Sequence, residues 1–227
     1  AKERPRVAYS QKTRQYLQRR SLRWLTRMGD AKSSQYTNYA RDILLNFSDA
    51  DARGAEKRTE YSYEYVNDRW NSRRTDTYFA DYSVYPILGF LLYQNSPRYT
   101  LAKAAGRWRC TPPYQPSEPA PAVREEAFPN LWDEAPEALV TLLQQSHCRI
   151  VNEFAIKAFR ANPHRDEYVT PTLITNLLNQ PYSESHQLGL ELAESVYDAK
   201  NPNQELVLAL LTCPLPEAQA LGMRWVD

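Results

Sequence analysis

Pairs of leucines recur at a regular interval along the second half of the chain. Each pair stands nine or ten residues before a short apolar triplet that contains a small residue, and equivalent positions lie 33 to 35 residues apart. The pairs are Leu142–Leu143, Leu177–Leu178 and Leu210–Leu211, and the triplets begin at Phe154, Leu188 and Leu221. This spacing predicts a helix ending near each pair, a short polar turn, and a second helix beginning near each triplet. We therefore expect a stack of antiparallel helix pairs from about Trp132 to the end of the chain.

Capping residues and prolines agree with these helix limits. Pro136 and Pro171 stand where the first helix of a pair begins, and Thr170 is a suitable N-cap. Asn162-Pro163 and Asn201-Pro202 stand where the second helix should end. The period fits tetratricopeptide or ankyrin repeats, but the signature patterns of both are missing. The segment instead resembles HEAT-like α-solenoid repeats over roughly residues 132–227, a resemblance that implies an extended binding scaffold.

The last predicted helix still carries apolar residues where the chain ends, at Trp225-Val226-Asp227. A terminal repeat without a polar cap leaves its apolar face unpaired. This favours a fragment of a longer protein, or a final helix that a partner covers.

The first half of the chain shows less regular helical patterns. An apolar stripe of Leu17, Ser21, Trp24, Leu25 and Met28 predicts a helix over residues 13–28 that ends at Gly29. A second helix over residues 34–47 should bury Tyr39, Ile43, Leu44 and Phe47, and a third is expected over residues 81–93. Alternation of Tyr61, Tyr63 and Tyr65 with polar residues fits either a short strand or an irregular segment.

A proline-rich segment separates the two halves. Residues 111–121 contain five prolines and no glycine, which is typical of a semi-extended connector. The predicted organisation is a basic, aromatic-rich helical module over residues 1–110, a connector over 111–122, and HEAT-like repeats over 123–227. The predicted fold class is all-α.

Charge divides the chain more sharply than its net value of +1 suggests. Residues 1–30 contain nine Lys or Arg and two acids, whereas residues 117–227 contain seven basic and sixteen acidic residues. The basic first helix could hold the phosphates of a nucleic acid, or pair with an acidic protein surface. Arginines also interleave with tyrosines and Trp70 in residues 58–85, a composition found where bases stack, at protein interfaces and in ordinary packing. The candidate nucleic-acid-binding residues are Lys12, Arg14, Arg19, Arg20, Arg23, Arg27, Arg69, Arg73 and Arg74.

Catalytic and metal-binding patterns are weak. Cys110, Cys148 and Cys213 form no CxxC pair, which indicates neither a disulfide framework nor a zinc knuckle and favours a reducing, cytoplasmic location. His147 and His186 could approach each other, but no third ligand accompanies them. The Asp49-Ala50-Asp51 motif resembles a metal clamp, yet its helical context favours exposed carboxylates, and we expect Glu125-Glu126 to be exposed as well. No apolar run approaches the length of a membrane span.

The sequence therefore predicts a non-catalytic helical-repeat scaffold without a cofactor or a metal. Its expected partner is another protein or another domain of the same chain, and a membrane is not expected. The alternative is a protein that binds DNA or RNA through the basic first helix and the Arg/Tyr-rich region.

Overall fold

The computed structural model describes residues 10–102, 106–116, 118–198 and 200–226. The chain forms two compact units. Unit 1 comprises Ala1–Ser33 and Ala50–Ala127, and unit 2 comprises Ser34–Asp49 and Phe128–Asp227. The short segment before Ala50 thus belongs with the C-terminal helices.

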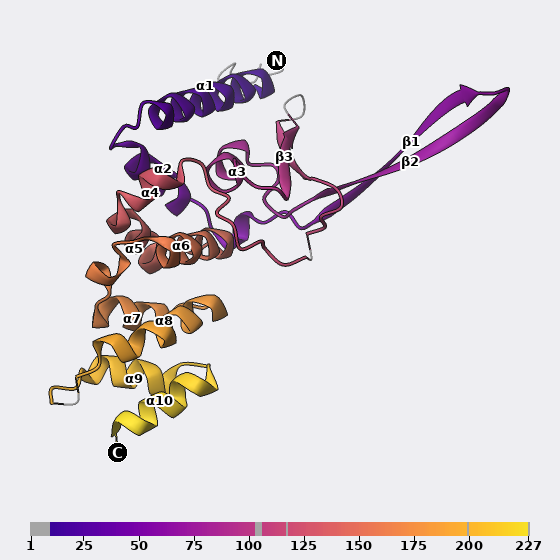
Figure 1. Cartoon of the computed structure of the whole chain (residues 1–227). Coiled ribbons are helices and arrows are strands. Elements are labelled where there is room, and N and C mark those ends of the chain that lie inside the picture. The colour runs from indigo at the N-terminus through magenta and orange to yellow at the C-terminus, as the bar shows by residue number, and fades with distance from the viewer. Residues whose placement is uncertain (1–9, 103–105, 117, 199, 227) are drawn as a thin grey trace, which may run out of the picture. The chain divides into compact units, whose positions relative to one another are not determined.

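The prediction of an all-α fold is wrong, because unit 1 contains two antiparallel two-stranded sheets. The first pairs β1 (Glu56–Val66) with β2 (Arg69–Phe79), and the second pairs β3 (Tyr99–Ala102) with β4 (Arg107–Cys110). Two helices accompany them, α1 (Gln11–Asp30) and α3 (Pro86–Tyr93) (Figure 1). Both faces of β1 and of most of β2 are exposed, so apart from the alternating tyrosines no hydrophobic period marked these strands in the sequence.

Helix α1 begins at a side-chain cap, since the Ser10 hydroxyl accepts a hydrogen bond from the Thr13 amide. Of its predicted apolar stripe only Leu25 is buried, while Leu17 and Trp24 are exposed. Leu25 and Gly29 are the residues of α1 that lie in the core, and α1 packs on α3. The predicted stripe was therefore rotated away from the face that the fold buries.

The core of unit 1 forms around α3. The indole of Trp108 lies directly over Gly89, where an added Cβ would come within 2.2 Å of the ring. The same indole donates a hydrogen bond from Nε1 to the Pro86 carbonyl oxygen at 3.1 Å. Helix and strand can approach this closely only because Gly89 has no side chain.

A largely buried ion pair joins Arg98, just before β3, to Glu125, which follows the proline-rich segment. Arg98 donates from Nε and Nη2 to the two carboxylate oxygens of Glu125, at 2.8 and 2.6 Å. The guanidinium lies 5.0 to 5.7 Å from the ring centres of Tyr93, Tyr99 and Tyr114. Burial lowers the pKa of Arg98, but Glu125 more than offsets this and holds that pKa above its usual value. The expectation that Glu125 is exposed was wrong. Its carboxylate is buried against Arg98, and this pairing could not be predicted because Arg98 lies 27 positions earlier in the sequence.

Unit 2 consists of helices. They are α2 (Tyr36–Leu45), α4 (Pro129–Asp133), α5 (Pro136–Gln145), α6 (Arg149–Ala161), α7 (Pro171–Leu178), α8 (Ser183–Val196), α9 (Gln204–Thr212) and α10 (Pro216–Val226). Consecutive helices pack as α5 with α6, α7 with α8, and α9 with α10, and α7 contacts both α5 and α9 (Figure 1). Thr170 caps α7 by accepting from the Leu173 amide at 3.1 Å.

Small residues allow these helices to pack closely. A Cβ on Gly189 would come within 3.1 Å of Leu178, and one on Gly222 within 3.1 Å of Leu210 and Leu211. The glycines of the second and third apolar triplets therefore pack directly against the preceding leucine pairs.

Helix α2 packs on this helical layer through a face that shares only Leu44 with the predicted set. Tyr36, Thr37, Ala40 and Leu44 are buried, whereas Tyr39 is exposed. The Tyr36 ring packs edge-on against Phe128 and Trp132.

Asp49 has a structural role in unit 2 that replaces the metal-clamp interpretation. Its Oδ1 accepts from the Arg149 amide at 2.7 Å, at the start of α6, and its Oδ2 accepts from the Tyr182 hydroxyl at 3.0 Å. Burial and this hydrogen bond raise the pKa of Tyr182. Asp49 therefore binds its segment to two helices of the C-terminal layer.

Candidate nucleic-acid interface

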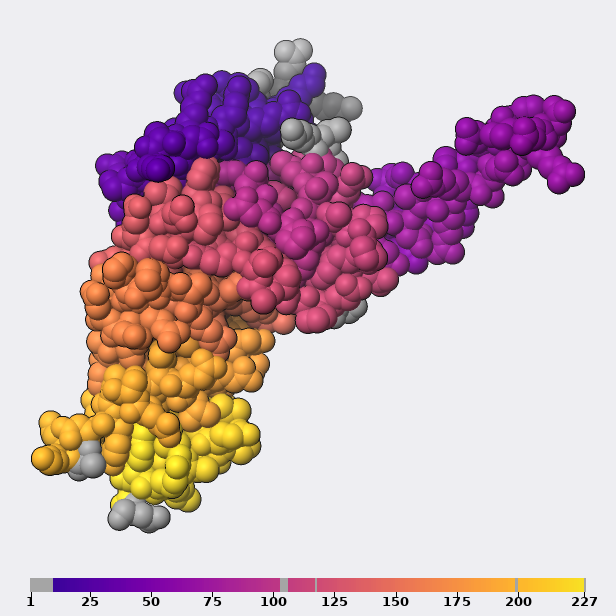
Figure 2. All heavy atoms as spheres, viewed as in Figure 1, coloured from indigo at the N-terminus to yellow at the C-terminus, as the bar shows by residue number. Residues whose placement is uncertain are grey.

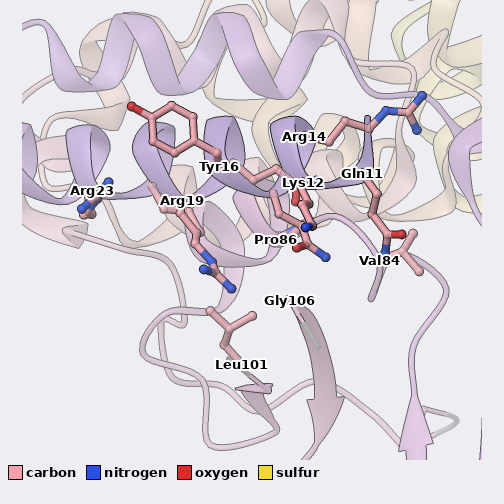
Figure 3. A pocket seen from close by; sticks show the side chains of 13 residues that line it. Gln11, Lys12, Arg14, Tyr16, Arg19, Arg23, Val84, Pro86, Leu101 and Gly106 are labelled. Atoms are coloured by element: carbon pink, nitrogen blue, oxygen red, sulfur yellow. The ribbon is translucent and has the colours of Figure 1, made fainter. Parts of the chain in front are cut away.

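A groove runs along α1 in unit 1. Its other wall is formed by Val84, Pro86, Leu101 and Gly106, and its volume is about 1080 Å³ (Figure 3). Arg19 points from α1 toward Leu101, and Lys12 lies beside Pro86 (Figure 3). We call this feature the basic groove, because its described lining residues include no acid and four cations, which are Lys12, Arg14, Arg19 and Arg23.

The six cations of α1 are Lys12, Arg14, Arg19, Arg20, Arg23 and Arg27. Within the described residues of unit 1, none of them forms an ion pair. Arg19, Arg23 and Arg27 follow one another at intervals of four residues, a spacing that brings like charges together on a helix and destabilises it slightly. Lys12 to Arg23 spans about 16 Å of helix. An anionic chain in the groove would relieve this repulsion.

The second feature is an exposed arm made of β1 and β2. Figures 1 and 2 show it projecting from the rest of unit 1. Its turn consists of Asn67 and Asp68, whose φ values of 51° and 59° are those a two-residue hairpin turn of type I′ requires. At its base, Arg107 pairs with Glu56 at 2.8 Å and lies 4.0 Å from the centre of the Phe79 ring. The base is thus fixed to β4, while β1 is exposed along its whole length.

Strand register gives the arm two different faces. Tyr61 pairs with Arg74, Tyr63 with Ser72 and Tyr65 with Trp70, so these residues share one face. We call this the aromatic face and define it by the rings of Tyr61, Tyr63, Tyr65 and Trp70. The opposite face carries Arg69 and Arg73.

Asp76 organises the charges near the base of the arm. Its carboxylate accepts from Thr59 at 2.7 Å and pairs with Lys57 and Arg74, each at 3.0 Å. These hydrogen bonds, first that of Thr59 and then those of Arg74 and Lys57, lower the pKa of Asp76. Arg74 is therefore already paired, whereas Arg69 and Arg73 have no ion pair among the described residues.

The nine residues proposed from the sequence fall into two groups. Six lie on α1 and three on the arm, and four of the α1 group, Lys12, Arg14, Arg19 and Arg23, line the basic groove. The wall opposite α1 was missed, because Val84, Pro86 and Leu101 come from later segments that no local pattern links to α1. The alternation of tyrosines was the one available signal for the aromatic face.

Within the described parts of the chain, no three His, Cys, Asp or Glu side chains come together as a metal site. None of the helices described there combines the length and apolar character that crossing a membrane requires.

Comparison with protein-family models, curated proteins and solved structures finds no significant match. The HEAT-like resemblance consequently stays a prediction.

Proposed function

We propose that this protein binds nucleic acid through the phosphate backbone, with α1 as the main contact. The observation that carries the proposal is the set of six cations on one exposed helix that have no ion pair within the described part of unit 1. Cations of this kind release counterions from a polyanion when they bind it, which makes binding favourable at low salt.

The basic groove gives these charges a defined path. Lys12, Arg19 and Arg23 line the same groove, and their spread along α1 matches a backbone lying parallel to the helix. Contacts of this type fix the position of a nucleic acid without reading its sequence. The proposal therefore concerns affinity for a polyanion and not sequence specificity.

A salt titration of the unmodified chain tests this proposal. Six phosphate contacts predict that affinity for a single strand falls about 300-fold between about 50 and 200 mM salt, because each contact contributes about 0.7 to the slope of log K against log salt. Fluorescence anisotropy of a labelled oligonucleotide measures this fall. Absence of binding at the lower salt concentration would refute the proposal.

Unit 2 supports a second candidate, the binding of another protein by a HEAT-like helical scaffold. The last helix pair exposes Leu208, Met223 and Val226, each more than 60% accessible. Leu208 lies on α9 and Met223 and Val226 lie on α10, and exposed apolar side chains on this helix pair favour an interaction site. If the chain binds no oligonucleotide, this protein-binding scaffold becomes the leading candidate. A cytoplasmic location is proposed separately, because Cys110, Cys148 and Cys213 are free cysteines.

A further inference from the structure

The rings of the aromatic face lie in water. Tyr61, Tyr63, Tyr65 and Trp70 are 56 to 71% exposed, and Tyr65 and Trp70 contact each other with ring centres 5.2 Å apart. An isolated two-stranded hairpin is marginally stable, and four exposed rings add an unfavourable hydration cost. A ligand that covers these rings would remove that cost.

The spacing of the rings suits nucleobases. Tyr61, Tyr63 and Tyr65 are alternate residues of one strand, so their side chains leave the same face about 6.8 Å apart. Stacked bases lie about 3.4 Å apart. A base inserted between two consecutive rings would therefore be covered on both of its sides.

The composition of the arm favours bases over phosphates and over an apolar protein groove. Residues 56–79 contain five basic and five acidic residues, so the arm offers little net attraction to a backbone. Val66 is their only aliphatic residue, and it lies on the opposite face in register with Arg69. The aromatic face thus presents flat amphipathic rings without aliphatic neighbours.

We infer that the aromatic face stacks the unpaired bases of a single-stranded nucleic acid whose phosphates are held by α1. This inference rests on the proposed function and adds the substrate class, because bases inside a duplex cannot insert between the rings. The two surfaces make separable contributions. Contacts of α1 depend on salt, whereas stacking on the arm does not.

Replacing Tyr61 and Tyr63 together with threonine tests the inference. Threonine suits a strand but has no ring, and Tyr63 faces only Ser72 across the arm. Loss of two stacked bases predicts about 100-fold weaker binding of a single strand, or about tenfold for each ring. The slope against salt and the affinity for the annealed duplex should stay as in the unmodified chain.

Two control variants keep the test specific. Tyr61→Phe with Tyr63→Phe retains both rings and should bind the single strand normally. Ser62→Thr with Asn71→Thr changes the opposite face and should also bind normally.

Other outcomes would overturn the inference. Unchanged single-strand affinity in the threonine variant would rule out base stacking on the aromatic face, but it would not contradict the proposed phosphate contacts of α1. Equal losses for single strand and duplex would show that the arm does not select unpaired bases. If light scattering showed that the unmodified chain and the control variants are dimers and that the threonine variant is a monomer, the aromatic face would be a contact between two copies. An unmodified chain that binds neither oligonucleotide would refute the proposed function itself.

Discussion

Replacing Arg19, Arg20, Arg23 and Arg27 with glutamine is expected to weaken single-strand binding about 10³- to 10⁴-fold at about 50 mM salt. Glutamine retains helix propensity and length but removes four charges that have no ion pair within the described residues of unit 1. The slope of log K against log salt should become shallower by about 3, since each lost contact removes about 0.7. Anisotropy titrations at several salt concentrations measure both quantities.

Lysine at the same four positions provides the matched control. It keeps the charge, so the salt slope should stay close to that of the unmodified chain even where bidentate arginine contacts are lost. A glutamine variant with an unchanged slope would contradict the assignment of the phosphate contacts to α1. Removing like charges from one helix face also relieves repulsion, so the glutamine variant should be no less stable.

Glu125→Ala is expected to lower the free energy of unfolding of unit 1 by about 3 to 5 kcal/mol. The substitution leaves the Arg98 guanidinium buried among three tyrosine rings without its carboxylate. It also removes the acceptor of the hydrogen bond from the Ser96 hydroxyl. Urea denaturation followed by tryptophan fluorescence measures the change.

The double variant Arg98→Met with Glu125→Leu separates the cost of an unpaired charge from the value of the pair. It removes both charges and fills the space with apolar atoms, so we expect it to be more stable than Glu125→Ala. A double variant less stable than the single one would show that the ion pair itself stabilises unit 1 strongly.

Helical segments with a regular apolar period could be located from the sequence. The leucine pairs and the small-residue triplets fall on consecutive helices of unit 2, where Leu142, Leu177 and Leu210 are fully buried. Such a pattern is local, because each helix buries one face against the next helix in the chain. The limits of these helices follow from nearby caps and prolines such as Thr170 and Pro171.

Features that depend on distant residues could not be predicted. Glu125 is buried because Arg98, 27 positions earlier, reaches it, and nothing in the Glu125-Glu126 dipeptide indicates this. The arm could not be predicted for a different reason. With water on both faces, its strands have no hydrophobic alternation, and only the tyrosines at positions 61, 63 and 65 suggested a strand.

The candidate site was predictable in part. The cations of α1 are close in sequence and could be identified as a group, but the groove that four of them line depends on Pro86 and Leu101. The expected single Arg/Tyr surface is divided in the structure, because strand register places Tyr63 and Arg73 on opposite faces.

Photo-cross-linking of the unmodified chain to a single strand containing 5-iodouridine tests most directly whether unit 1 binds unpaired nucleic acid. This base cross-links to aromatic rings that stack on it, and peptide mapping locates the attachment. We predict cross-links at Tyr61, Tyr63, Tyr65 or Trp70, lost when the strand is annealed to its complement. Cross-links confined to unit 2, or equal labelling by strand and duplex, would contradict the account.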